Sequence, residues 1–503
     1  MIGLLAFVGL TVDAGTLYIG MGHLRRAVDA AALAAASQFR EGRSYTELEA
    51  AARQVVSLNG VVPETLVLSA CVDRNDPVPA GFHDPAMCPG PNGLQRKLIR
   101  VTATTRVRFS FLALVGWFDT EIQAQAISEA ASVDVALAID TSSSMTQDAR
   151  CGDGDDDDAD GVADDGCGAP LDANRDDAGA NPAVCNALDP TGLDGFPGEC
   201  HPFQEVKIAS VNFVERLYYP YDRVAVTTFD IVPTLWVPIT NTNTFTQTAD
   251  VIRNLQVSPT RGPDITVECT YNIDGDPGGC TNTSIGGGLL QAGNEFGRNP
   301  VRVESVWVVI LLTDGAANAS ALVGGDINRY CPSTTWVQPF CRDNDGDTRH
   351  SVLNTPKANP NNVYDTAQYD SDDYARDMAD FVGCAPDVAD AAVWCSDTLD
   401  YADPVDPEGG QGALVYAVGL GRLVLNFTQG GDIDAGDRTL RYIAAVGDDG
   451  DASTDPCAGE PVPVLADGND SYSCGNYFFS EFGTGLTAVF ESIASRLFTR
   501  LTR

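Results

Sequence analysis

Basic residues are scarce in this sequence, and lysine is nearly absent. The 503 residues include 31 lysines and arginines against 70 aspartates and glutamates, which gives a formal net charge of −39. The lysines are Lys97, Lys207 and Lys357. A surface this acidic repels phosphate backbones and anionic lipid, so we expect no nucleic-acid partner. It attracts cations, and the hydrophobic content of 44% is sufficient for most of the chain to fold.

Catalytic motifs are also missing. The sequence has no GxSxG, HExxH or SxxK motif, and no phosphate-binding loop of the type GxxxxGKS or GxxxxGKT. The histidines lie far apart in the sequence, which is typical of surface residues; they are His23, His83, His201 and His350. We therefore expect a binding protein and not an enzyme. A metal-assisted hydrolase is the enzymatic alternative, because an open metal site can activate water.

A CxxC motif is absent as well, which argues against a structural zinc site or a thioredoxin-type centre. The 14 cysteines fall into couples of sequence neighbours within loop-like stretches. Local disulfides made in an oxidising compartment explain this pattern, and free cytosolic thiols are the alternative. The candidate disulfide cysteines are Cys71 with Cys88, Cys151 with Cys167, Cys185 with Cys200, Cys269 with Cys280, Cys331 with Cys341, Cys384 with Cys395, and Cys457 with Cys474.

The N-terminal segment is apolar over Ile2–Val12, is interrupted by Asp13, and continues mostly apolar to Gly22. Counted through Asp13, it has about the 20 residues that cross a bilayer as a helix, so residues 1–24 are predicted to be a transmembrane anchor. A buried core helix and a cleaved signal are the alternatives. An alanine-rich amphipathic helix follows from Leu24, and Ser44 with Glu47 forms a capping box for another helix.

Two alternating segments, 98–109 and 121–130, predict half-buried strands, and a short apolar segment at 111–116 connects them. Residues 25–132 are therefore predicted to form a small α+β module, arranged somewhat like a pilin. The run 9–18 followed by 24–36 resembles the N-terminal segment of TadG-like proteins of the Flp/Tad pilus-assembly group. In that family the segment is a single membrane anchor, so the resemblance implies a single-pass protein of a bacterial membrane with the bulk of the chain outside.

The rest of the chain alternates buried strands with helices. Strands are predicted at 133–140, 222–230, 306–315 and 412–421, and helices at 203–217, from Thr283 to Ala292, at 373–381 and at the C-terminus. The order predicts an α/β fold, a doubly wound and mostly parallel sheet of Rossmann-like type over 133–503. Ligands of such sheets bind at the carboxyl ends of strands, and the buried strands at 133–140 and 306–315 have Asp140 and Asp314 there.

Three loops at these strand ends resemble the metal-ion-dependent adhesion site (MIDAS) of von Willebrand factor A (VWA) domains. Asp140-Thr-Ser-Ser-Ser matches the family's D-x-S-x-S motif, Thr283 matches the threonine of its second loop, and Asp314 matches the aspartate of its third. The resemblance implies a metal site made by Asp140, Ser142, Ser144, Thr283 and Asp314. Their oxygen atoms suit Mg²⁺ or Mn²⁺, which would take a further carboxylate from a protein partner. Taken singly, the first motif is also a plausible helix cap and the third a plausible turn.

Two long inserts, at about 149–200 and 317–410, leave the sheet beside the metal loops. The first has aspartates at calcium-loop spacing, Asp156, Asp158, Asp160 and Asp164, with Cys167 at the position of the usual final glutamate. A solvated acidic loop that binds nothing is the alternative. The second insert contains a weaker calcium candidate, Asp343–Asp347. Both inserts are expected to form the rim of the binding face, where loops set specificity.

These features together predict a membrane-anchored, extracytoplasmic VWA protein that binds its ligand through a metal. We expect it to be linked to Flp/Tad pilus assembly or to surface attachment. The partner is expected to be a protein that offers a carboxylate, or a pilus or envelope component. The alternative is an envelope scaffold in which the metal only holds loops together; ligand binding that chelators abolish separates adhesion from that scaffold.

Overall fold

The structure is a computed structural model. It describes residues 2–38, 44–71, 81–88, 96–146, 202–230, 233–257, 283–317, 371–384, 411–426, 435–449, 457, 471–480 and 485–500. The chain divides into two compact units, one of residues 1–132 with 497–503 and one of residues 133–496.

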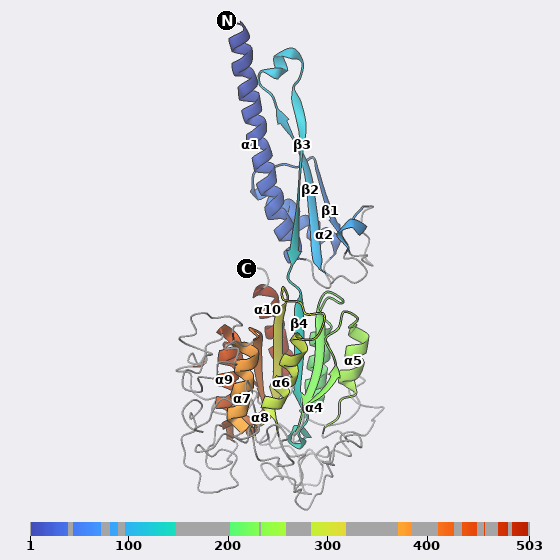
Figure 1. Cartoon of the computed structure of the whole chain (residues 1–503), viewed down its shortest axis with the longest axis vertical. Coiled ribbons are helices and arrows are strands. Elements are labelled where there is room, and N and C mark those ends of the chain that lie inside the picture. Colours follow the sequence, from blue (N-terminus) through green and yellow to red (C-terminus); the bar gives the residue numbers. More distant parts are fainter. Residues whose placement is uncertain are drawn as a thin grey trace, which may run out of the picture. The chain divides into compact units, whose positions relative to one another are not determined.

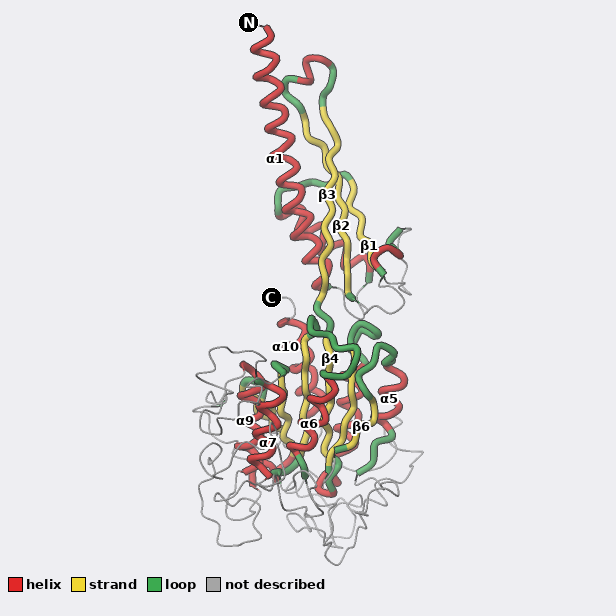
Figure 2. The backbone as a smooth tube through the Cα atoms, viewed as in Figure 1, coloured by secondary structure: helices red, strands yellow, loops and turns green. Residues whose placement is uncertain are grey.

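The first unit packs two helices against an antiparallel three-stranded sheet (Figures 1 and 2). Its helices are α1 (Ile2–Ser37) and α2 (Tyr45–Leu58), its strands are β1 (Thr65–Ala70), β2 (Lys97–Arg108) and β3 (Asp119–Ala130), and η1 (Pro85–Met87) and η2 (Leu112–Val115) are short 3-10 turns. Strand β2 is central, with β1 and β3 on its two sides. The predicted strands at 98–109 and 121–130 therefore form, and β1 was not predicted.

Helix α1 runs without a break through the apolar segment and the alanine-rich segment that follows it. Its second half has a buried stripe of small and medium side chains, at the spacing of one helix face, which packs on β2 and β3; the stripe is Leu24, Ala27, Val28, Ala31 and Ala35. Helix α2 begins with the predicted capping box, because Glu47 N donates to Ser44 Oγ and Ser44 N donates to Glu47 Oε2. Among the described residues, no helix has an apolar stretch sufficient to cross a membrane.

The second unit is a mixed α/β fold built on a seven-stranded sheet of order β6-β5-β4-β7-β8-β10-β9. The strands are β4 (Val133–Asp140), β5 (Arg223–Phe229), β6 (Thr234–Val237), β7 (Val306–Thr313), β8 (Leu414–Leu420), β9 (Ser471–Cys474) and β10 (Tyr477–Ser480). Strands β5, β4, β7, β8 and β10 are parallel neighbours, and the edge strands β6 and β9 are antiparallel. The mostly parallel sheet expected from the sequence is confirmed. The edge strands β6 and β9 and the strand β10 were not predicted.

The connections are η3 (Ser143–Thr146) and helices α4 (Phe203–Val214), α5 (Phe245–Arg253), α6 (Ile285–Phe296), α7 (Ser371–Gly383), α8 (Gly421–Asn426), α9 (Ala435–Asp449) and α10 (Leu486–Arg500). All eight residues of β4 are buried, and successive side chains of a strand point to opposite faces, so both faces of the sheet are covered. On one face, residues of α6, α7 and α9 form a single core cluster with Ala136 and Ala138 of β4. Elsewhere, Phe213 of α4 contacts Phe490 of α10.

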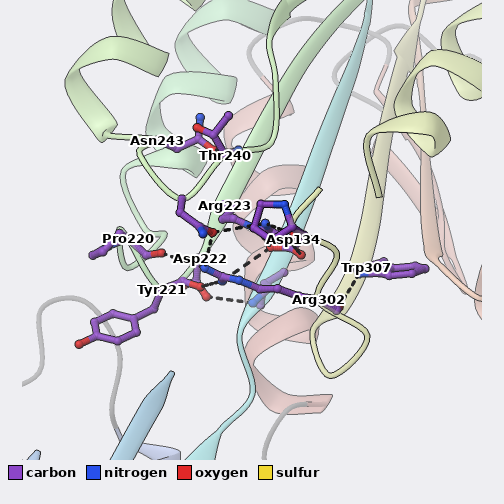
Figure 3. A network of polar contacts seen from close by, with 12 residues as sticks. Asp134, Pro220, Tyr221, Asp222, Arg223, Thr240, Asn243, Arg302 and Trp307 are labelled. Carbon is purple, nitrogen blue, oxygen red and sulfur yellow. Dashed lines mark hydrogen bonds and ion pairs between the residues drawn. The ribbon is translucent and has the colours of Figure 1, made fainter. Parts of the chain in front are cut away.

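The amino ends of the central strands hold a buried polar network, which Figure 3 shows from close by. Arg223 at the start of β5 forms an ion pair with Asp134 at the start of β4, and both side chains are at most 2% exposed. Arg302, just before β7, donates to the carbonyl of Tyr221. Asp222 accepts from the backbone N–H of Val133 at 3.0 Å. The network therefore joins β4, β5 and β7 at the end of the sheet opposite to the predicted metal loops.

Two of the predicted cysteine couples are disulfides in the structure, Cys71–Cys88 in the first unit and Cys457–Cys474 in the second. Cys384 is also disulfide-bonded. The remaining candidate cysteines lie outside the described residues.

Candidate metal centre

Three aspartates lie at one edge of the sheet, where β4, β5 and β7 end. In the parallel register, Asp140 of β4 lies beside Phe229 of β5, and Ile139 of β4 lies beside Leu312 of β7. Asp140 itself, Asp230 after β5 and Asp314 after β7 therefore come to the same edge of the sheet. All three are at most 3% exposed. The topology thus brings together carboxylates from distant parts of the sequence.

The D-x-S-x-S loop is closed by its own hydrogen bonds. The backbone N–H of Ser142 donates to Asp140 Oδ1 at 2.8 Å, which folds the loop back over the end of β4. The hydroxyl groups of Ser142 and Ser144 are 2.9 Å apart. The spacing of the motif thereby places three oxygen-bearing side chains on one side of a tight turn.

The first and third loops meet directly. Ser144 Oγ donates to Asp314 Oδ1 at 2.8 Å, and Thr313 Oγ1 donates to Asp140 Oδ2 at 2.6 Å. Asp140 and Asp314 are therefore each held by a hydroxyl group from the other loop. The structure thus brings four of the five predicted ligands into one hydrogen-bonded cluster, which consists of Asp140, Ser142, Ser144 and Asp314.

The second loop reaches the same edge through β5. The backbone N–H of Ser284 donates to the carbonyl of Asp230 at 2.7 Å, so Thr283 lies at the carboxyl end of β5, directly before α6. Thr283 is buried, with 3% of its surface exposed. The glycines that open α6 allow this close approach: a Cβ atom at Gly288 would come within 2.4 Å of the Phe229 ring.

The electrostatics of the cluster favour a bound cation. Burial raises the pKa of Asp140 to about 6, although hydrogen bonds from Thr313 and Ser142 lower it in part. Burial, and then the charge of Asp140, raise the pKa of Asp314 well above its ordinary value. Two buried carboxylates that repel each other are costly when both are ionised, and a divalent cation between them would reverse that cost.

The donor set suits a hard divalent cation. In the described part of the chain, no three histidine, cysteine, aspartate or glutamate side chains form a metal cluster. The candidate centre instead combines two carboxylates with hydroxyl groups, and oxygen ligands of this kind suit Mg²⁺ and Mn²⁺. In addition, the hydroxyl oxygen of Ser284 is fully buried and has no hydrogen-bond partner among the described residues. These residues therefore fit the group that the sequence resemblance implies.

Sequence reasoning missed three residues of this edge: Asp230, Thr313 and Ser284. Asp230 is the last residue of the strand predicted at 222–230, and an aspartate at the end of a strand is the same signal that singled out Asp140 and Asp314. Thr313 precedes Asp314, and its bond to Asp140 spans 173 residues of sequence. That bond depends on the neighbouring positions of β4 and β7, which a local motif does not specify.

The two inserts are described only in part. The first insert, with the calcium-loop residues Asp156, Asp158, Asp160 and Asp164, lies outside the described residues, as does Asp343–Asp347. Helix α7 falls within the second insert as predicted from the sequence. Its residues Tyr374 and Met378 are buried in the core cluster with α6 and α9, so this helix belongs to the body of the unit and not to its rim.

No family model matches the sequence. No curated protein matches it either. Among solved structures, the chain is similar to proximal thread matrix protein 1 of the mussel byssus, with 12% identity, a TM-score of 0.31, and coverage of 73% of this chain and 48% of that one. This chain thus spans about half the length of the mussel protein. Another structure of the mussel protein has zinc at its MIDAS motif.

Two further similar structures come from pili. The D319A mutant of the PilB minor pilin from Streptococcus sanguinis has 12% identity and a TM-score of 0.37, and the match covers 82% of this chain and 77% of that one. The vWF domain of the type V pili tip protein Mfa5 from Porphyromonas gingivalis has 13% identity and a TM-score of 0.31, with coverage of 75% and 98%.

Proposed function

We propose that this chain is a cell-surface binding protein whose VWA-like unit holds Mg²⁺ or Mn²⁺ and, through it, a carboxylate of a protein partner. The ligands would be Asp140, Ser142, Ser144, Thr283 and Asp314. The observation that carries the proposal is the hydrogen-bonded cluster in which Ser144 links Ser142 to Asp314 beside Asp140. Two loops far apart in the sequence supply its oxygens, and Thr283 of another loop lies at the same edge of the sheet; the VWA resemblance marks these loops.

The composition of the cluster supports binding over catalysis. A divalent cation held by few charged ligands keeps part of its positive charge and can accept one more carboxylate. The cluster itself has no histidine or lysine to move a proton, and its carboxylates and hydroxyl groups bond one another. A metal-assisted hydrolase stays the weaker alternative, and turnover of a substrate would favour it.

The charge of the chain restricts how a partner is recognised. The net charge of −39 repels an acidic protein at separations within about 10 Å, the distance beyond which salt screens the repulsion. Attraction must then arise locally, at the metal. We therefore expect ligand binding to depend on the metal completely, and a chelator to abolish it. If the metal only holds loops together, as in the scaffold alternative, the chelator loosens the fold and no bound ligand is released.

The test is a calorimetric titration of the full chain with Mg²⁺ and with Mn²⁺. Wild type is expected to bind one equivalent at the edge of the sheet, and Asp140→Ala is expected to lose that binding because it removes a charged ligand. The fold should remain, since the side chain lies at the end of β4 and outside the core clusters. Thr283→Ala should weaken binding of an acidic ligand more than it weakens folding.

The matched control is Asp250→Ala, which removes a carboxylate from the exposed surface of α5 in the same unit. It changes the net charge by the same amount and should bind the cation like wild type. Absence of cation uptake by wild type at millimolar concentration, or equal uptake by Asp140→Ala, contradicts the proposal.

The location proposed is the outside of a bacterial cell, linked to Flp/Tad pilus assembly or surface attachment. The disulfides Cys71–Cys88 and Cys457–Cys474 support an oxidising compartment. Membrane attachment through residues 1–24 stays a prediction. Fractionation of native cells tests it, because a soluble mature form that begins after residue 24 would show that the apolar segment is a cleaved signal.

Calcium binding by residues 156–164 also stays a prediction. If these residues form a calcium loop, Ca²⁺ should protect that stretch from proteolysis.

A further inference from the structure

The first unit exposes an apolar surface at one end, built from two segments far apart in the sequence. One is the first part of α1, where Phe7 is 68% and Leu10 is 54% exposed. The other is the connection between β2 and β3, where Leu114, Val115, Trp117 and Phe118 are between 58% and 83% exposed. Figure 1 shows this connection beside the first turns of α1. We call the two segments together, residues 7–12 and 109–118, the apolar tip.

The two segments of the apolar tip are fixed to each other. A Cβ atom at Gly9 would lie 2.8 Å from the Phe111 ring, so the missing side chain lets the connection pack against the helix backbone. Farther along α1, a Cβ atom at Gly20 would lie 2.7 Å from Val107. The connection between β2 and β3 therefore follows α1 closely and presents its apolar side chains beside those of the helix.

Asp13 also holds the connection to α1, because its carboxylate accepts hydrogen bonds from backbone N–H groups of the connection. Its carboxylate accepts from the backbone N–H groups of Ser110 at 2.7 Å, Phe111 at 3.0 Å and Leu112 at 2.7 Å, and it is 1% exposed. These N–H groups open the η2 turn, where a helix leaves its donors without internal partners. The hydroxyl of Thr11 likewise donates to the carbonyl of Val8. Internal satisfaction of this kind is what lipid requires of buried backbone.

The apolar tip itself contains no charged residue, although the whole chain is strongly acidic. Residues 1–26 and 106–118 contain four arginines and, apart from Asp13, no acidic residue. Arg106 pairs with Glu64 and Asp119, while Arg25, Arg26 and Arg108 are exposed. Arginines near a membrane surface bind lipid phosphates, and Trp117 is of the type that anchors at the interface. Arg108 directly precedes residue 109 of the apolar tip, whereas Arg25 and Arg26 lie about 20 Å farther along α1, beyond the distance of about 8 Å over which charges act at physiological salt.

We infer that the apolar tip inserts into a phospholipid leaflet, so that the connection between β2 and β3 is a second lipid-binding element beside α1. Residues 2–13 of α1 measure about 18 Å at 1.5 Å per residue, close to half of a hydrocarbon core of about 30 Å. The tip thus reaches into one leaflet, and Arg108 at its border remains at the headgroups. This inference does not depend on the metal centre, and either can fail without the other.

The first test is flotation of the full chain with vesicles of phosphatidylcholine and phosphatidylglycerol. The double variant Leu114→Glu/Val115→Glu should lower the vesicle-bound fraction roughly tenfold or more, because it places two charges where apolar side chains enter lipid. Both side chains are at least 80% exposed, so the fold should remain. The control is Leu58→Glu/Val62→Glu, which makes the same change at side chains 78% and 83% exposed in the same unit but outside the apolar tip.

The second test separates insertion of the connection from attachment by α1 alone. Lipids brominated in their acyl chains should quench tryptophan fluorescence of the wild-type chain, and Trp117→Phe should remove that quenching while Trp236→Phe retains it. Unchanged quenching in Trp117→Phe, or equal flotation of wild type and Leu114→Glu/Val115→Glu, overturns the inference. So does a Leu114→Glu/Val115→Glu variant that alters only the sedimentation of the chain, since the tip would then be a contact between copies.

Discussion

Asp140 is a fully buried carboxyl group whose ionised form the fold disfavours. Its pKa is raised to about 6, mainly by burial. Because the folded pKa lies above the unfolded value of 3.8, the stability linked to this proton is present below that value and is lost as pH rises through about 6. At neutral pH and without metal, the ionised group therefore destabilises the fold by roughly 1–3 kcal/mol.

Asp140→Asn should consequently stabilise the metal-free protein at neutral pH. The amide keeps the shape of the side chain and removes the buried charge. In EDTA, we expect urea unfolding to give a gain of about 1 kcal/mol or more at about pH 7.5 and a smaller gain at about pH 5. At the higher pH, excess Mg²⁺ should make wild type more stable than Asp140→Asn, because the cation binds and stabilises only wild type.

The control for this comparison is Asp250→Asn, which neutralises an exposed carboxylate. It should leave the urea unfolding curve unchanged at both pH values. If Asp140→Asn is less stable than wild type in EDTA at both pH values, the carboxylate is not a destabilising group in the metal-free state. The electrostatic argument for a cation at this position then fails.

At the scale of elements, the strands of the second unit have different roles at their two ends. The carboxyl ends hold the candidate metal cluster, and the amino ends hold the ion pair of Asp134 with Arg223 (Figure 3). Asp134 and Asp140 are the second and last residues of β4 and stand about 20 Å apart along it, at about 3.3 Å per residue. One end can therefore be altered without touching the other.

Removal of one partner of the buried pair should be costly. Asp134→Ala leaves Arg223 buried without its carboxylate, and we expect a loss of roughly 3–5 kcal/mol in the free energy of unfolding. Mg²⁺ affinity measured by calorimetry should not change where the variant is folded. Asp134→Asn, which retains the shape and part of the hydrogen bonding, should lose less.

An exposed ion pair provides the comparison. Arg216 and Glu491 are 45% and 56% exposed, and Glu491→Ala should cost less than about 1 kcal/mol. Urea denaturation of Asp134→Ala, Asp134→Asn and Glu491→Ala measures these free energies of unfolding. An Asp134→Ala variant as stable as Glu491→Ala would show that the network at the amino ends contributes little.

At the scale of the whole molecule, the two units carry separate chemistry. Every predicted metal ligand lies in the unit of residues 133–496, and the apolar tip lies in the unit of residues 1–132. Each unit also has a disulfide of its own, between cysteines 17 residues apart. A closed loop of this length constrains the unfolded chain, which stabilises the folded state by about 3 kcal/mol.

Cys71→Ser/Cys88→Ser should therefore destabilise the first unit by about 3 kcal/mol and leave Mg²⁺ binding unchanged. Thermal unfolding followed by hydrogen exchange of peptides from each unit measures the two effects separately. Cys457→Ser/Cys474→Ser is the reciprocal variant, and its loss should appear in peptides of the second unit. Loss of cation binding in Cys71→Ser/Cys88→Ser would contradict the assignment of the centre to the second unit alone.

The sequence by itself determined the features that near neighbours decide. Apolar runs that end in aspartate located β4 and β7, and the Ser44–Glu47 capping box located the start of α2. The bond from Ser142 N to Asp140 Oδ1 joins residues two positions apart, so the motif alone specifies it. Residues separated by a few positions keep the same geometry in any fold that contains the same local element, which is why such patterns can be read directly.

Only the tertiary structure decided which distant residues meet. The bond of Ser144 to Asp314 spans 170 residues, and the bonds of Asp13 to the β2–β3 connection span nearly 100. Asp230 and Thr313 join the metal edge because β5 and β7 flank β4, and the short strands β9 and β10 form because β8 offers an edge. Strand order depends on the packing of the whole core, and the periodicity of a single segment contains no information about its neighbour in the sheet.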